Sequence, residues 1–464
     1  MKALQLLQTF SKKDWHWFEK FLKSPAFNQN NHLIAWFLSL KKQKNKITAN
    51  SDFFFDKSLP DAALERSKEH HQANYFLKTT EQYLAWDEWQ SDETAQLLFL
   101  LSACRKRGAD RHFKTVHQRL EQQLEQQPLR NPQYLRWRYS SLHEEYQRGM
   151  EAGRTDAAQL QALSDWQDAA FAAEKLRNGC MLLSRRKVLK TEFDTGLLVS
   201  VLAFVEARPV LLEHPAIAAY YHGYLALSRP EEEGHFFALK ALLGRVERHF
   251  PVHELRDIYL LCVNFCINRI NLRQNNYLRE LLNLYQAGLE AGVFLENGQI
   301  SRFTYTNIAL LALRMKEFDW VLRFIEHHRP LLPEAQREAT YGFNLARYYC
   351  ETGDYNRAMP LLQTIDFDDV LHQLMAKTML LRMYYETGEL SALSSLLSSF
   401  STFLRRKGQV AEQQKTAYLN TIRFVRKLTA LRPGDRRLRA ALRNEIRETP
   451  LVAEKDWLLG VMEP

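Results

Sequence analysis

Closely spaced cysteines are the first residues of this chain that could carry chemistry. Cys262 and Cys266 stand four residues apart, so on a helix both thiols would share one face and could hold a metal ion or form a redox pair. Their neighbours are typical core residues: Leu260, Leu261, Val263 and Phe265. We therefore expect two small buried side chains, and no metal or redox site.

Patterns for catalysis or cofactor binding are absent from the sequence. The chain has no glycine-rich phosphate loop and no serine elbow. The pair His249 and His253 lacks the partner carboxylate of a zincin motif, and Pro251 would break its helix. His327 and His328 precede Arg329 and Pro330, where cationic side chains suit the carboxyl end of a helix. We expect no catalytic residue, no cofactor and no metal. An enzyme would need residues that only folding brings together.

Positive charge gathers near the carboxyl terminus. Residues 401–464 hold 14 Lys+Arg and 7 Asp+Glu, a net +7 that leaves +2 of the total +9 for the first 400 residues. Six arginines on two predicted helices are candidates for anion binding: Arg423, Arg426, Arg436, Arg439, Arg443 and Arg447. The last four flank an apolar stripe of Leu438, Leu442 and Ile446, so that helix should dock and still expose arginines.

Two interpretations of this basic end remain open. Arginines at this spacing suit nucleic acid or another anionic surface, although few aromatic residues lie among them to stack on bases. A solubilising polar cap on the last repeat of an array fits equally well. Arg405 and Arg406 lie before these helices and fit a separate role, that of complementing the carboxyl end of their own helix.

Composition predicts an all-α protein. The 464 residues are 46% apolar and 25% charged, and only 17 are glycine and 14 proline. The longest mostly apolar run, residues 197–205 with Ser200 inside it, is well short of the roughly 20 residues that span a bilayer. The opening MKALQLLQTFSKKDW lacks the apolar core of an export signal, and five cysteines, an odd number, suit a reducing compartment. We expect a cytoplasmic protein.

Helix signals divide the chain into three parts. Ser11 and Asp14 form a capping-box pattern before a helix that should stop at Ser24 and Pro25, and a long helix should end near Ser91. This predicts an amino-terminal helical unit over 1–91. A divergent array of helical hairpins follows over 92–295, including one long helix with a stripe from Leu160 to Leu176. Repeats with a basic carboxyl-terminal helical cap occupy 296–464.

The segment LARYYCETGDYNRAMPLL, residues 345–362, carries the clearest pattern. Two apolar stripes with helical spacing flank Gly353, which suits a left-handed turn, and Asp354, which suits the start of a helix. The order resembles the tetratricopeptide repeat, whose signature positions are taken here by Leu345, Ala346, Tyr349, Gly353, Tyr355, Ala358 and Leu362.

Fainter copies lie on either side. Downstream, the matching residues are Leu380, Tyr384, Gly388, Leu390 and Leu397; upstream they are Ile308, Ala309, Phe318 and Pro333. Departures are Gly342 at a tryptophan position, Leu381 and Lys316 at small or glycine positions, and Pro360 within the second helix, where we expect a kink. As a whole the chain is similar to a family of bacterial helical-repeat proteins, a likeness carried by FEKFLKSPAFN, CINRINLRQNNY and LLRMYYETGEL, and this brings no activity with it.

The resemblance implies a right-handed α-solenoid of antiparallel helical hairpins in which the first helix of each hairpin lines a concave groove. Its groove positions here include Arg347 and Arg382, which would form a row able to grip the carboxylates of a peptide. Glu351 and Glu386 follow each arginine by four residues and offer internal partners instead. We expect a non-enzymatic scaffold for an unidentified protein or peptide; the alternative is nucleic-acid or anionic-surface binding through the carboxyl-terminal helices.

Overall fold

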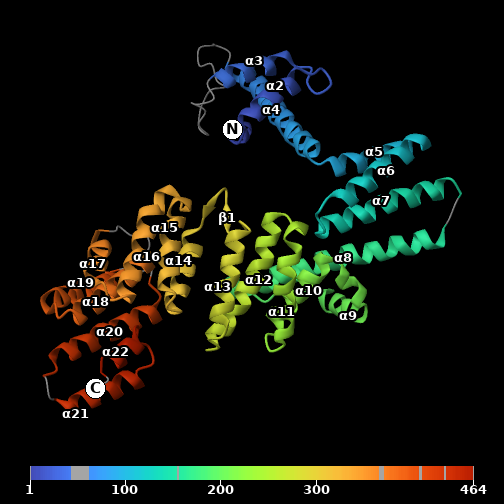
Figure 1. The fold of residues 1–464 in the computed structure, drawn as a ribbon. Coiled ribbons are helices and arrows are strands. Elements are labelled where there is room, and N and C mark those ends of the chain that lie inside the picture. Colours follow the sequence, from blue (N-terminus) through green and yellow to red (C-terminus); the bar gives the residue numbers. More distant parts are fainter. Residues whose placement is uncertain are drawn as a thin grey trace. The chain divides into compact units, whose positions relative to one another are not determined.

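The protein is all-α, as predicted. The computed structural model describes residues 2–42, 62–153, 156–364, 370–406, 410–432 and 435–462, and nearly all of these lie in helices (Figure 1). None of the described helices is long and apolar enough to span a membrane. The chain divides into two compact units, Met1–Glu174 and Lys175–Pro464. The boundaries predicted at 91 and 295 stay predictions, although a helix does end at Ser91.

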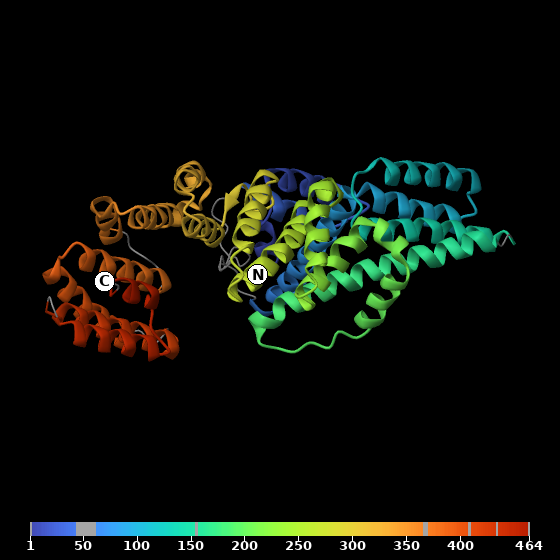
Figure 2. The same ribbon diagram turned by 60° about the horizontal axis from the view of Figure 1, so that its bottom comes forward.

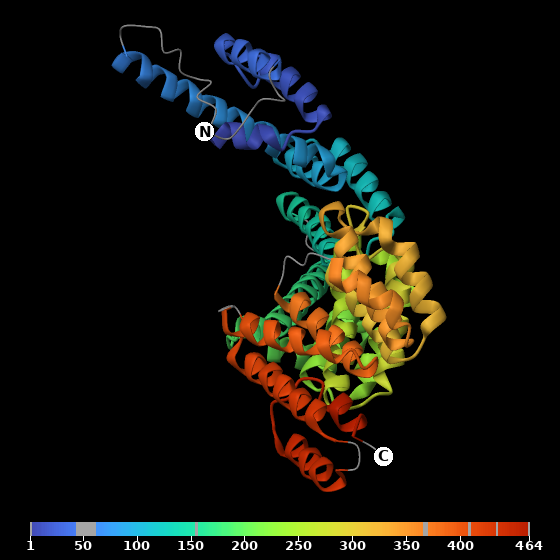
Figure 3. The same cartoon turned by 90° about the vertical axis from the view of Figure 1, so that its left-hand side faces the viewer.

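The first unit begins with four helices around an aromatic core. Its helices are α1 (Lys2–Gln8), α2 (Lys12–Lys23), α3 (Asn31–Lys42), α4 (Ala62–Ser91), α5 (Glu93–Lys106), α6 (Asp110–Gln126), α7 (Pro132–Glu151) and the first part of α8 (Ala157–Leu189). The predicted capping box is present: Ser11 and Asp14 bond reciprocally at the start of α2. Phe18 of α2 packs against Phe37 of α3 and Tyr83 of α4 in this core, and Figure 3 shows α1 to α4 in blue. The long helix expected around Leu160–Leu176 is α8.

The second unit continues with helices α9 to α22. Their bounds are α9 (Leu198–Ala207), α10 (Pro215–Ser228), α11 (Glu233–Val246), α12 (Val252–Asn271), α13 (Tyr277–Glu290), α14 (Arg302–Arg314), α15 (Phe318–His328), α16 (Arg337–Glu351), α17 (Tyr355–Thr364), α18 (Val370–Glu386), α19 (Leu390–Arg406), α20 (Glu412–Ala430), α21 (Arg436–Glu448) and α22 (Lys455–Gly460). Short 3-10 helices cover Pro209–Glu213, Glu247–His249, Arg329–Leu331 and Glu334–Gln336. Two antiparallel strands of two residues each, β1 (Leu295–Glu296) and β2 (Gln299–Ile300), form a short hairpin.

Several helices of the second unit pack both with the next helix and with the one after it. α10 lies against α11 and α12, α14 against α15 and α16, and α16 against α17 and α18 (Figure 1). Because each helix has an apolar stripe that one neighbour alone does not cover, the second contact completes its burial. Ala358 of α17, for example, is fully buried among Phe343 of α16 and Met383 of α18.

One turn geometry closes several of these hairpins. Gly353 and Gly388 have φ of +81° and +74°, and the amide of the next residue donates to a carbonyl five residues back: Asp354 to Tyr349 at 2.8 Å and Glu389 to Tyr384 at 2.9 Å. This satisfies carbonyls that the helix end leaves free. Asp354 then accepts from the amide of Arg357 at 3.3 Å, so the turn proceeds directly into α17.

The same turn forms where the sequence has no glycine. Lys316, a departure from the repeat signature, has φ +59°, and Glu317 donates to Ala312 at 3.0 Å. Arg273 has φ +65°, and Gln274 donates to Arg269 at 3.1 Å. A left-handed residue with a side chain is strained, so the flanking helices must hold these two positions in place.

The carboxyl-terminal helices share one core. Leu404 of α19, Val425 of α20, Ile446 of α21 and Leu458 of α22 are all fully buried in it, and Figure 2 shows these helices in red near the carboxyl end. The apolar stripe predicted on α21 needs correction. Leu442 and Ile446 are buried, whereas Leu438 is 57% exposed because it lies in the first turn of α21, away from that core.

Candidate functional site

The predicted groove residues form a charge cluster on the facing sides of α16 and α18. Nε of Arg382 lies 3.0 Å from Oε1 of Glu386, the internal pairing that the four-residue spacing suggested. Its Nη1 lies 3.9 Å from Oε1 of Glu351, which belongs to the preceding hairpin. The structure therefore brings Glu351, Arg382 and Glu386 together, and the arginine is held between two carboxylates.

Glu386 is the most heavily bonded member of this cluster. Its Oε1 accepts from Nε1 of Trp457 at 2.7 Å, and its Oε2 accepts from the hydroxyl of Tyr355. Burial opposes the charged form, but the hydrogen bonds from Tyr355, Trp457 and Arg382 outweigh it and lower the pKa of Glu386. This carboxylate is a fixed structural anion.

Arg347 differs from Arg382 in having a donor to spare. Its side chain is half-buried, and its Nη1 is buried without a hydrogen-bond partner in the described part of the chain. Burial lowers the pKa of this guanidinium, while the nearby Glu351 and Glu454 raise it. A buried guanidinium N–H without an acceptor costs about 1 to 3 kcal/mol. Because Nη1 is buried, a carboxylate supplied from outside would reach it only after neighbouring side chains move aside.

The carboxyl-terminal end of the chain lies against this cluster. The ring of Trp457, on α22, meets Tyr385 of α18 edge-on, with centroids 5.7 Å apart. Glu454, just before α22, has φ +54°, and its carboxylate interacts electrostatically with the guanidinium of Arg347. The sequence patterns did not place Trp457, Glu454 or the signature residue Tyr355 in this cluster, because these contacts join segments far apart in the chain.

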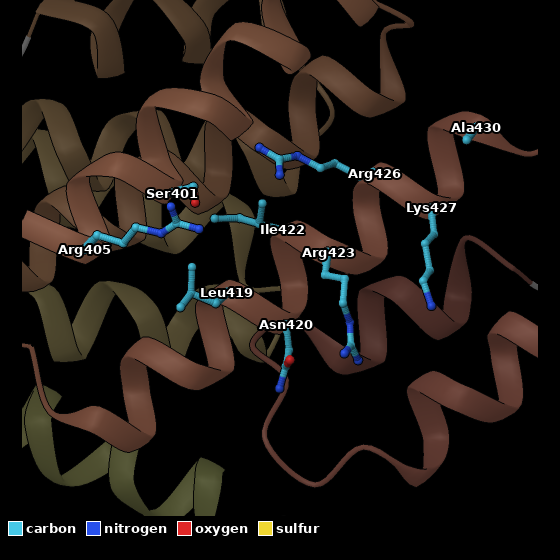
Figure 4. Close-up of a pocket in the computed structure, with 9 residues that line it drawn as sticks. All are labelled: Ser401, Arg405, Leu419, Asn420, Ile422, Arg423, Arg426, Lys427 and Ala430. Atoms are coloured by element: carbon cyan, nitrogen blue, oxygen red, sulfur yellow. The ribbon is translucent and has the colours of Figure 1, made fainter.

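The six predicted anion-binding arginines separate into two groups. Arg423 and Arg426 line a cavity on α20, and Figure 4 shows both side chains there. The other four lie on α21: Arg436 and Arg447 are exposed, Arg443 is half-buried, and Arg439 is exposed but donates to the carbonyl of Val461 at 2.8 Å. The arginines of α21 are not among the residues that line the cavity.

The cysteines are buried side chains in helices. Cys262 and Cys266 are both fully buried, as predicted, and all five thiols are free. Burial raises the pKa of Cys262 and raises that of Cys266 to about 12, so neither is a thiolate at neutral pH. Among the described residues, no group of three or more His, Cys, Asp or Glu side chains is arranged to hold a metal ion.

Comparison with known proteins adds no relative: no family model, curated protein or solved structure matches the chain.

Proposed function

We propose that this chain is a non-enzymatic interaction scaffold of the cytoplasm, a right-handed solenoid of tetratricopeptide-like hairpins that binds a protein or peptide partner. The observation that carries the proposal is the repeated hairpin. The turns at Lys316, Gly353 and Gly388 share one geometry and follow one another at intervals close to the repeat length. The free state of all five cysteines suits a reducing compartment.

Polar contacts between successive hairpins support the same architecture. Three ion pairs join residues 36 to 40 positions apart: Arg269 with Glu233, Lys240 with Glu280, and Arg279 with Glu317. Contacts at a near-constant separation are expected when each repeat meets only its neighbours. Stacking of this kind creates an extended surface that a partner chain can follow.

The binding surface proposed here is the α16–α18 face centred on Arg347. Arg382 is already paired with Glu351 and Glu386, whereas Arg347 keeps an unpaired donor. A carboxylate of the partner, from an acidic side chain or a chain terminus, would accept from that donor. Arg347 is thus the recognition residue, and Arg382 positions the carboxylates around it.

Affinity capture tests this function. The tagged chain is incubated with native lysate, with and without nuclease, and the bound fraction is identified by mass spectrometry. We expect a protein partner whose binding persists after nuclease treatment. Recovery of nucleic acid alone, released by moderate salt, would instead support the second candidate function, anion binding by the basic carboxyl-terminal helices. The exposed positions of Arg436 and Arg447 favour that candidate.

A further inference from the structure

A cavity of about 540 Å³ lies between α19 and α20. Its polar lining residues are Ser401, Arg405, Asn420, Arg423, Arg426 and Lys427, with apolar side chains between them. The volume falls within the range of small-molecule sites. Four lining residues are cations and none is a carboxylate, so the cavity is strongly basic.

Only part of this charge is balanced within the protein. Glu445 of α21 lies 2.7 Å from Nζ of Lys427 and 3.6 Å from Nη2 of Arg423, so both cations are directed toward one carboxylate. Among the described residues, the guanidinium groups of Arg405 and Arg426 have no ion pair and no hydrogen bond. Four cations against one carboxylate leave a net charge of +3 at the cavity.

The two unpaired arginines approach the cavity from different helices. Figure 4 shows Arg405 extending from α19 past Ser401, and Arg426 extending from α20 toward the same space. Arg405 thus points back along α19, as long helical side chains do, and not toward the helix carboxyl end that the sequence suggested it would complement. Two like charges directed into one space repel each other unless an anion lies between them.

The lining groups suit a phosphate. Two guanidinium groups offer forked donors that match phosphate oxygens, and the Ser401 hydroxyl adds a neutral donor. The amide of Asn420 is already engaged, because its Nδ2 donates to the carbonyl of Leu451 at 2.8 Å. No aromatic side chain lines the cavity, so a nucleobase would find no stacking surface. Recognition would therefore be of the phosphate and not of a base.

We infer that the α19–α20 cavity is a phosphate-binding site in which Arg405 and Arg426 grip the anion and Ser401 completes its hydrogen bonds. The phosphate belongs either to a small phosphorylated compound or to a nucleic-acid backbone. The inference is independent of partner binding at Arg347, because the two sites share no residue.

Calorimetric titration with two probes tests the site and separates the two sources. The probes are inorganic pyrophosphate and a 20-nucleotide oligothymidylate, each at low and at moderate salt. The test variant is Arg405→Gln with Arg426→Gln. The matched control is Arg406→Gln with Arg432→Gln, which removes two exposed arginines that do not line the cavity. Melting curves check that both variants fold.

The inference predicts that the test variant weakens binding roughly tenfold or more and that the control changes it less than about twofold. Loss of pyrophosphate binding assigns the site to small phosphorylated compounds. Loss of oligonucleotide binding alone assigns it to a nucleic-acid backbone. The site is rejected if the wild-type protein binds neither probe, if the test variant binds normally, or if the control loses as much affinity.

Discussion

Nε1 of Trp457 donates a hydrogen bond to Oε1 of Glu386 at 2.7 Å, across 71 residues of sequence. This contact joins α22 to α18 at the carboxylate that also holds Arg382. The last helix of the chain is therefore packed against the cluster that carries the proposed function. Leu458 of α22 and the following Met462 are buried in the core that the carboxyl-terminal helices share, so α22 is an integral part of the second unit.

Trp457→Phe should lower the free energy of unfolding by about 1.5 to 3 kcal/mol, because the charged acceptor Glu386 loses a donor while the aromatic packing is mostly kept. Urea unfolding measures the change. Trp320→Phe is the matched control, since Trp320 stacks on Phe324 in α15. Equal losses in both variants would show that the hydrogen bond contributes nothing of its own.

Gly353→Ala should destabilise the protein by about 1 to 2 kcal/mol. An added Cβ would meet nothing within 4 Å, so the cost comes from the backbone at φ +81° alone. Gly234→Ala, in α11, also enters open space but at an ordinary helical φ, and should be neutral or mildly stabilising. Thermal unfolding compares the two variants. A neutral result for Gly353→Ala would contradict the left-handed turn.

Stability should fall as the pH drops from 6.5 toward 4. Nδ1 of His222 lies 2.9 Å from Nδ1 of His235, and burial together with that neighbour lowers the pKa of His222 to about 4. His222 is neutral when folded, whereas the unfolded chain takes up a proton below its ordinary pKa of about 6.5, so acid favours unfolding.

The contribution of this histidine should be about 1 to 2 kcal/mol across that pH range, reduced from the full shift because the ring is only half-buried. Denaturant unfolding at several pH values, for wild type and His222→Gln, measures it. His112→Gln, at an exposed position on α6, is the control. An unchanged pH slope in His222→Gln would exclude His222 as its source.

All five cysteines should resist Ellman's reagent in the native protein and react fully after unfolding. Each is buried, and burial raises the pKa of Cys266 to about 12 and that of Cys350 to about 11. The absorbance of the released thiolate counts the thiols in each state. Rapid reaction of any native thiol would show that its helix opens far more readily than its packing implies.

Local structure followed from the sequence where neighbouring residues determine it. The capping box at Ser11 and Asp14, the left-handed turn at Gly353 and the pairing of Arg382 with Glu386 all depend on residues within four positions. These features are confirmed.

What the sequence did not reveal depends on distant packing or on neighbours that override a local preference. Lys316 adopts the left-handed turn without being glycine, because α14 and α15 fix it from both sides. Glu351 lies beside Arg382 and leaves a donor of Arg347 unpaired, which the four-residue spacing alone could not indicate. Trp457 lies 71 residues from its acceptor.

The affinity of the captured protein partner for variants of the α16–α18 face decides whether Arg347 is the recognition residue. Calorimetry would compare the wild-type chain with Arg347→Gln, Arg323→Gln as a matched exposed arginine on α15, and the triple change of Arg436, Arg439 and Arg443 to Glu. We predict a loss of roughly tenfold or more for Arg347→Gln alone, since one charge-assisted hydrogen bond is worth about 1.5 to 3 kcal/mol. Unchanged affinity in Arg347→Gln, with loss only in the triple variant, would contradict it.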